Sequence, residues 1–95
     1  MSGYRIDRQV MEFGEHVRGW RMVLGLTAQQ VSERAGITRD TLRKIESGNP
    51  NVSFNSVTQV LRALGILDQI VDAADPLASD IGRLRAGRLT RKRAR

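Results

Sequence analysis

The sequence predicts an all-α fold: five helices in residues 1–75, followed by a basic C-terminal tail in residues 76–95. Two observations predict it. Apolar residues recur at steps of three and four along most of the first 75 residues, which gives each helix one apolar face. Gly, Pro, Asn, Ser and Thr cluster between those stretches, where they start, end and connect helices. With 95 residues and 40% hydrophobic content, the chain suits one globular domain with a modest core.

The first expected helix carries an apolar stripe at helical spacing, which consists of Val10, Phe13, Val17, Trp20 and Leu24. We expect this stripe to pack against the next two helices, with Trp20 as the anchor of the core. Asp7 is the first candidate helix cap, so residues 1–6 are expected to fray. Gly14 and Gly19 each weaken the helix by about 1 kcal/mol relative to Ala, so it should depend on packing.

Residues 26–48 predict two short helices joined by a tight turn. Thr27 can cap the first helix by accepting a hydrogen bond from the backbone N–H of Gln30, whose side chain can reach back in a capping box. Gly36 suits the left-handed backbone that ends a helix, and Thr38 can cap the next one. The turn between the two helices is therefore about three residues long.

The second of these helices has an apolar face and a charged face. Leu42 and Ile45 lie three residues apart and point inward. Four charged side chains are then left on the outer face: Arg39, Asp40, Arg43 and Lys44. Such a face can enter the major groove of DNA, although by charge alone a solvated helix surface is the more ordinary interpretation.

From Phe13 to about Leu67 the chain resembles the XRE (Cro/phage-repressor) family of helix-turn-helix proteins. Glycines, caps and apolar positions carry the resemblance together: Arg18, Arg21, Gly25-Leu26-Thr27, Val31, Ala35-Gly36-Ile37-Thr38, Leu42, Ile45-Glu46-Ser47-Gly48, Val57, Leu61 and Ala63-Leu64-Gly65. It implies a repressor that binds a double-stranded DNA operator as a homodimer. It also implies that Arg18 or Arg21 braces the motif, whereas helical spacing alone pairs them with Glu12 or Glu15 on the surface.

The resemblance assigns roles to individual residues. The four charged residues of the outer face hold the positions that read base edges, with Arg39 as the favoured specificity residue. Gln29 follows Ala28, which stands where the family carries a phosphate-contacting Gln, and would reach phosphate if its helix were rotated. The remaining candidates for phosphate contact are Thr38, Thr41, Asn49, Asn51 and Ser53, the last three from the loop after the reading helix.

Two further helices are expected after that loop. Ser53 caps a helix from Phe54 to Leu64, whose expected inward face consists of Phe54, Val57, Leu61 and Leu64. A fifth, strongly apolar helix follows in residues 66–74. Four helices of this size leave little interior for it, so we expect a dimer interface made of Leu67, Ile70, Val71 and Ala74. The alternative is that this helix only closes the core.

Residues 76–95 form the tail, because Asp75-Pro76 breaks the fifth helix. Residues 1–75 hold nine basic and nine acidic residues, so the formal charge of +6 lies entirely in the tail. We expect the tail to be disordered or to fold on a partner through Ile81, Arg83, Leu84, Arg85 and Arg88. The run from Asp75 to Arg85 resembles the HipB-like antitoxins, which implies a HipA-like kinase toxin as a partner. Contact with DNA and simple solvation are the alternatives.

Several classes of protein are not expected. The chain has no Cys and a single His16, so no disulfide, metal centre or cofactor is expected. The sequence shows no nucleophile–base pair and no phosphate-binding loop, so an enzyme is not expected. No apolar run approaches a membrane span and the first residues lack a signal-peptide layout, so a cytoplasmic protein is expected.

The sequence thus predicts a dimeric DNA-binding repressor, an antitoxin that represses its own operon and holds a kinase toxin. The alternatives are a free-standing phage-type or metabolic repressor, and a protein-interaction module that uses the same fold as a scaffold.

Overall fold

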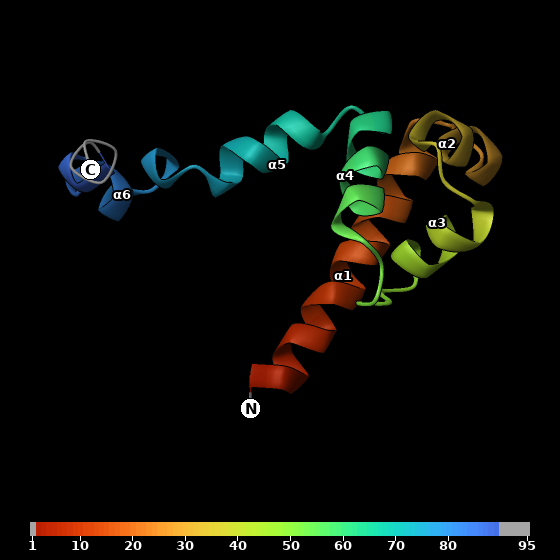
Figure 1. Cartoon of the computed structure of the whole chain (residues 1–95), viewed down its shortest axis with the longest axis horizontal. Helices are drawn as coiled ribbons and strands as arrows, with labels where there is room; N and C mark the ends of the chain where they lie inside the picture. The colour runs from red at the N-terminus through yellow and green to blue at the C-terminus, as the bar shows by residue number, and fades with distance from the viewer. Residues whose placement is uncertain (1, 90–95) are drawn as a thin grey trace.

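The structure, a computed structural model, describes residues 2–89 (Figure 1). Its elements, in chain order, are α1 (Ser2–Val23), α2 (Ala28–Ala35), α3 (Arg39–Glu46), α4 (Phe54–Ala63), α5 (Leu67–Ala74), the 3-10 turn η1 (Pro76–Ala78) and α6 (Asp80–Leu84). The described residues contain no strand, so the predicted all-α fold is confirmed. None of the helices in this part of the chain is long and apolar enough to cross a membrane.

The core lies where α1, α2, α3 and α4 meet. α2 packs mainly on α4, and α1 packs mainly on α3. The buried apolar side chains come from all four helices and from the turn after α4: Val17, Val31, Ala35, Leu42, Ile45, Val60, Leu61, Leu64 and Ile66. Burial of this apolar cluster fixes the position of α3 relative to the rest of the domain.

The path of α1 differs from the expectation in two ways. The helix begins at Ser2, not near Asp7, because no proline interrupts residues 2–6 and the single Gly3 does not break the helix. The prediction that Trp20 anchors the core was wrong. Trp20 is 40% exposed and Leu24 is 45% exposed, whereas Val17 is 2% exposed. The neighbouring helices cover only the part of α1 around Val17. Trp20 and Leu24, the second half of the apolar stripe, therefore stay on the surface.

Gly14 lies where α1 approaches α3 most closely. A Cβ atom at this position would lie 2.5 Å from the backbone oxygen of Ile45 and 2.7 Å from that of Glu46. Both distances are shorter than real Cβ contacts. The absence of a side chain at Gly14 therefore permits the two helices to pack with their backbones almost in contact.

The predicted turn between α2 and α3 is confirmed. Thr27 Oγ1 accepts from the N–H of Gln30 at 3.0 Å, and Gln30 Oε1 accepts from the N–H of Thr27 at 2.8 Å, which completes the capping box. Gly36 ends α2 with φ of 70°. Thr38 Oγ1 accepts from the N–H of Thr41 at 3.1 Å and so caps α3.

α4 begins at Phe54, as predicted, but Phe54 does not face the core. Its side chain is 81% exposed, whereas Val60 and Leu61 in the second half of the helix, and Leu64 directly after it, are buried. The core lies beneath the C-terminal half of α4, so an apolar residue in the first turn extends beyond it. Val57 is partly buried and packs against the core, as expected.

α5 leaves the bundle, and only its beginning helps to close the core. Ile66 is 6% exposed, and Leu67 is partly buried against the core, but Ile70 and Val71 are 41% and 59% exposed. Figure 1 shows α5 and α6 extending away from the four packed helices. The radius of gyration is accordingly 16.2 Å, against about 12 Å for a compact chain of this length. We call residues 67–89 the arm.

The described part of the predicted tail includes the short helical segments η1 and α6. The Asp75 carboxylate accepts from the N–H of Leu77 at 2.9 Å and Ser79 Oγ accepts from the N–H of Gly82 at 3.0 Å, so each segment has a cap. Gly82 has a low intrinsic helix propensity. Here its lack of a side chain is required, because a Cβ would overlap the backbone oxygen of Pro76. η1 and α6 therefore pack on each other, and residues 90–95 lie outside the described part of the chain.

Candidate nucleic-acid interface

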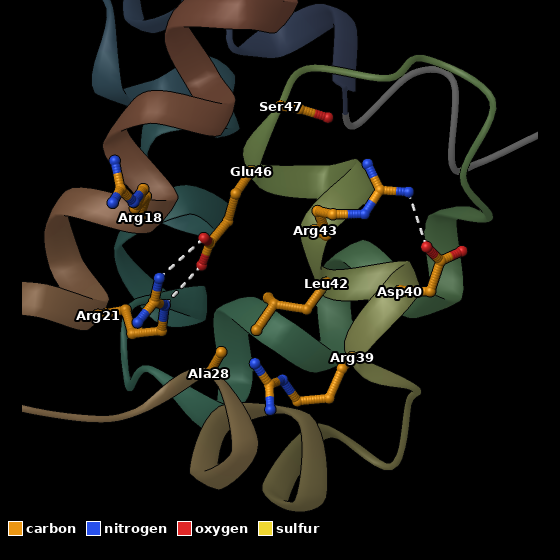
Figure 2. A pocket seen from close by; sticks show the side chains of 9 residues that line it. All are labelled: Arg18, Arg21, Ala28, Arg39, Asp40, Leu42, Arg43, Glu46 and Ser47. Atoms are coloured by element: carbon orange, nitrogen blue, oxygen red, sulfur yellow. Dashed lines mark hydrogen bonds and ion pairs between the residues drawn. The ribbon is translucent and has the colours of Figure 1, made fainter.

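A shallow hollow lies between α1, the start of α2 and the outer face of α3 (Figure 2). Charged side chains dominate its lining, which consists of Arg18, Arg21, Ala28, Arg39, Asp40, Leu42, Arg43, Glu46 and Ser47. Three of the four predicted base-reading residues are among them. Lys44, the fourth, is on the same helix and is joined to the group through Asp40.

Asp40 holds two of the three basic side chains on α3. Arg43 Nη2 donates to Asp40 Oδ1 at 2.7 Å, and Lys44 Nζ lies 3.4 Å from Asp40 Oδ2. The hydrogen bonds from Arg43 and then from Lys44 hold the pKa of the Asp40 carboxyl below its usual value, because they stabilise the carboxylate. Asp40 therefore contacts Arg43 and Lys44, and no ion pair joins it to Arg39 within residues 2–89.

Arg39 has a different environment from Arg43 and Lys44. It follows the Thr38 cap at the start of α3, and it forms no ion pair within residues 2–89. It lines the hollow together with Ala28 and Leu42 (Figure 2). Its guanidinium therefore has no carboxylate to release before it binds an acceptor.

Arg21 and Glu46 hold α3 against α1. Arg21 Nε donates to Glu46 Oε2 at 2.7 Å and Arg21 Nη2 donates to Glu46 Oε1 at 3.0 Å, and Figure 2 shows both bonds. Their side chains are only 15% and 11% exposed, so this paired geometry is shielded from solvent. The hydrogen bond with Glu46 raises the pKa of the Arg21 guanidinium. The expected brace is therefore Arg21, and its partner is on α3, not on α1.

Arg18 also lines the hollow, although the sequence predicted only a bracing role or a surface ion pair for it and no contact with DNA. It is exposed, and it lies one helical turn before Arg21 on the face of α1 that borders the hollow. No ion pair involves it in the described part of the chain. Its spacing from Arg21 could have placed it on this face, because residues three apart share a side of a helix.

The predicted phosphate contacts are divided between two places. Thr38 and Thr41 are at the start of α3, where the two hydroxyls are 2.9 Å apart. Gln29 is exposed on α2, and its Nε2 donates to Glu33 at 2.8 Å. These three residues lie near α3 or the hollow, but none of them lines the hollow.

The loop candidates lie at the other end of α3. Asn49 lines a separate hollow beside the N-terminal half of α1, and its Oδ1 accepts from the N–H of Asn51 at 2.8 Å. Ser53 Oγ caps α4 by accepting from the N–H of Ser56 at 3.0 Å. The structure therefore does not bring these side chains into the hollow that contains Arg39. Instead, they form an edge next to the C-terminal end of α3.

Comparison with known proteins identifies the family. Residues 12–74 match the family model described as a helix-turn-helix domain, about two thirds of the chain. The chain is also 39% identical, over 49 residues, to a protein of Methanothermobacter thermautotrophicus described as an uncharacterized HTH-type transcriptional regulator. That match covers 52% of this chain and 71% of the relative. No solved structure matches. The protein is thus a member of the helix-turn-helix domain family.

Proposed function

We propose that the protein is a transcriptional regulator that binds double-stranded DNA with α3 in the major groove and acts as a repressor by occupying its site. The observation that carries this proposal is that α3 is held firmly against the domain while its charged face stays exposed. Its outer face exposes three cations and one carboxylate, and the shielded Arg21–Glu46 pair fixes the helix to the domain. The major groove is wide enough to admit such a helix, whose side chains then face base edges.

Within this proposal, Arg39 is the main base-reading residue. It has no ion pair within the described residues, and an Arg side chain can donate two hydrogen bonds to the O6 and N7 atoms of guanine. Asp40, Arg43 and Lys44 complete the reading face. The phosphate contacts are assigned to Gln29, Thr38, Thr41, Asn49, Asn51 and Ser53, with Arg18 added from the structure.

We further propose that two copies bind together through α5. Leu67, Ile70, Val71 and Ala74 lie on a helix that projects from the bundle, and Ile70 and Val71 are largely exposed. An apolar helix that leaves its own domain gains most by packing against its equivalent in a second copy. A two-fold dimer would place two α3 helices about 34 Å apart, on successive major grooves.

We propose further that this regulator is an antitoxin, and the exposed apolar side chains of the arm support that role. Leu77, Ile81 and Leu84 are 45%, 59% and 82% exposed and are interspersed with basic residues. A purely electrostatic arm needs no apolar residues, whereas a segment that docks on a protein does. Under this proposal, Ile81, Arg83, Leu84, Arg85 and Arg88 contact a HipA-like kinase. A free-standing repressor would use the same DNA-binding surface without that contact.

DNA selection tests the proposed function. The full-length protein is incubated with a pool of randomised duplexes, and bound duplexes are amplified and sequenced over several rounds. We expect enrichment of a two-fold symmetric site. Enrichment no greater than that of a mock selection would overturn the proposal.

Arg39→Ala then tests the role of α3 on the selected duplex. Removal of a bidentate pair of hydrogen bonds should weaken binding by roughly 1–3 kcal/mol and relax the preference at one base pair in each half-site. Arg34→Ala is the matched control, because Arg34 is an exposed arginine on α2 outside the hollow. A uniform weakening over all variants of the site would identify Arg39 as a residue that binds phosphate.

A further inference from the structure

Of the four charged residues on the outer face of α3, only Asp40 is acidic. Its two carboxylate oxygens face two different cations: Oδ1 lies 2.7 Å from Arg43 Nη2, and Oδ2 lies 3.4 Å from Lys44 Nζ. All three side chains remain largely in solvent, at 59%, 67% and 45% exposure. The pairs therefore add little to the stability of the domain, because solvent screens exposed ion pairs.

The same pairs matter more once DNA is near. Any duplex offers phosphate oxygens, and binding without sequence preference comes from cations that neutralise them. Arg43 and Lys44 have N–H donors that Asp40 does not use, but while they stay paired with Asp40 its carboxylate offsets part of their charge and lies near phosphates of like charge. Thus Asp40 opposes the interactions that every DNA sequence offers equally.

A suitable base pair offers Asp40 a hydrogen-bond donor, which phosphate does not provide. Guanine presents the acceptors O6 and N7 in the major groove, and cytosine presents an N4 amino donor there. A G·C pair thus supplies an acceptor for Arg43 and a donor for Asp40 while the two side chains stay in contact. Adenine N6 is the other donor that the major groove offers to a carboxylate.

We propose that Asp40 is a specificity-determining residue, which restrains Arg43 and Lys44 on non-cognate DNA and accepts a hydrogen bond from a cytosine amino group in the cognate site. This inference rests on the proposed DNA binding of α3. It adds that Asp40 limits the binding of α3 to non-cognate DNA. Arg39 reads without restraint, whereas Arg43 reads only where the neighbouring base satisfies Asp40.

Three variants of the full-length protein test this proposal. Asp40→Asn keeps the size of the side chain and removes the charge. Asp40→Glu keeps the charge. Glu15→Gln is the control, because it raises the net charge by the same amount from an exposed position on α1, outside the hollow. Each is measured against a random-sequence duplex and against the duplex that the wild-type protein selects, over a range of salt concentrations.

We expect Asp40→Asn to bind the random duplex roughly tenfold more tightly at 0.1 M salt. Its slope of log affinity against log salt should steepen by about 0.9 for each cation released to phosphate. Affinity for the selected duplex should not rise, so the ratio of specific to random binding falls about tenfold. Asp40→Glu should recover most of this ratio, and Glu15→Gln should leave it unchanged.

Two results would overturn the proposal while leaving DNA binding intact. One is a specific-to-random ratio that is the same for Asp40→Asn as for the wild type. The other is an equal change in Glu15→Gln, which would assign the effect to net charge. Failure of the wild-type protein to select any duplex is a separate result, since it removes the proposed function itself. Thermal unfolding of each variant confirms that the fold is retained.

Discussion

Two glycines of α1 have opposite surroundings, although the sequence gives both the same cost to the helix. A Cβ at Gly14 would meet the backbone of α3 at 2.5 Å, whereas a Cβ at Gly19 would meet nothing within 4 Å. Gly14→Ala should therefore force the helices apart and destabilise the fold by roughly 1–3 kcal/mol. Gly19→Ala should stabilise it by about 1 kcal/mol through helix propensity alone. Urea unfolding followed by circular dichroism measures both, and equal effects would contradict the close packing of α1 on α3.

Ser32 is a polar residue in an apolar place. It is 2% exposed, and its Oγ has no hydrogen-bond partner among the described residues. Because an unsatisfied buried hydroxyl is unfavourable, Ser32→Ala should raise the free energy of unfolding by about 1 kcal/mol. Ser56→Ala is the control. The Ser56 hydroxyl is hydrogen-bonded to the Ser53 hydroxyl at 2.9 Å, so its removal should not raise the free energy of unfolding. A destabilised Ser32→Ala would mean that the hydroxyl has a partner in solution.

Local residue pairs were predictable from the sequence, and distant ones were not. The caps at Thr27 and Thr38 each join atoms three residues apart, so spacing alone identified them. The partner of Arg21 is 25 residues away on another helix. Helical spacing therefore suggested a glutamate on α1 itself. Asp40 is an intermediate case, because its partner Arg43 is local, but which of the neighbouring arginines it binds depends on side-chain geometry.

Among whole elements, periodicity identified the helices but not the faces that other helices cover. Phe54 and Trp20 share apolar stripes with buried residues, and both are exposed. A stripe shows which residues lie on one side of a helix, while the position of the neighbouring helices decides how much of it is buried.

The exposed face of α5 leads to a prediction about assembly. Replacing Ile70 or Val71 by Asp should leave a folded monomer, because both side chains are largely exposed in the single chain and would be buried only between copies. Circular dichroism reports the fold, and analytical ultracentrifugation reports the mass. Binding to the selected duplex should fail with the dimer, since one half-site offers too few phosphate and base interactions.

Gln69→Asp is the matched control for this helix. Gln69 is an exposed polar residue of α5, so an added charge there should leave the dimer intact. A folded Ile70→Asp variant that remains dimeric would exclude this face of α5 from the interface. An unfolded variant would show instead that α5 folds back to close the core.

At the scale of the whole molecule, the net charge and the buried core lie in different parts of the chain. Residues 1–75 carry no net formal charge, and the formal charge of +6 lies in residues 76–95. The buried core lies entirely before Leu67. The basic segment thus lies beyond a domain without net formal charge, so any long-range attraction of the segment to DNA can be measured separately from the proposed binding of α3.

A chain that ends at Asp75 separates the roles of this segment, because it keeps the core, α3 and α5. If the segment lies along DNA, the slope of log affinity against log salt should fall by about 0.9 for each phosphate that the shortened chain no longer neutralises, with little change in sequence preference. If it docks on a kinase toxin, affinity for the selected duplex at physiological salt should hardly change, while inhibition of a HipA-like kinase disappears. Both quantities are measured on one preparation of each chain.

We expect the second result, because the exposed Leu77, Ile81 and Leu84 give the segment an apolar surface that binding to phosphate does not need. Leu84→Ser tests that surface without changing the charge, and it should weaken inhibition of the kinase while leaving the salt slope unchanged. Arg88→Ser removes a charge from another residue of the proposed kinase contact, so it should change the salt slope only if the segment also lies along DNA. A large change in salt slope on truncation, with inhibition intact, would assign the segment to DNA. If neither quantity changes beyond the long-range charge effect, which disappears as the Debye length falls toward about 3 Å at 1 M salt, the segment only keeps the protein solvated.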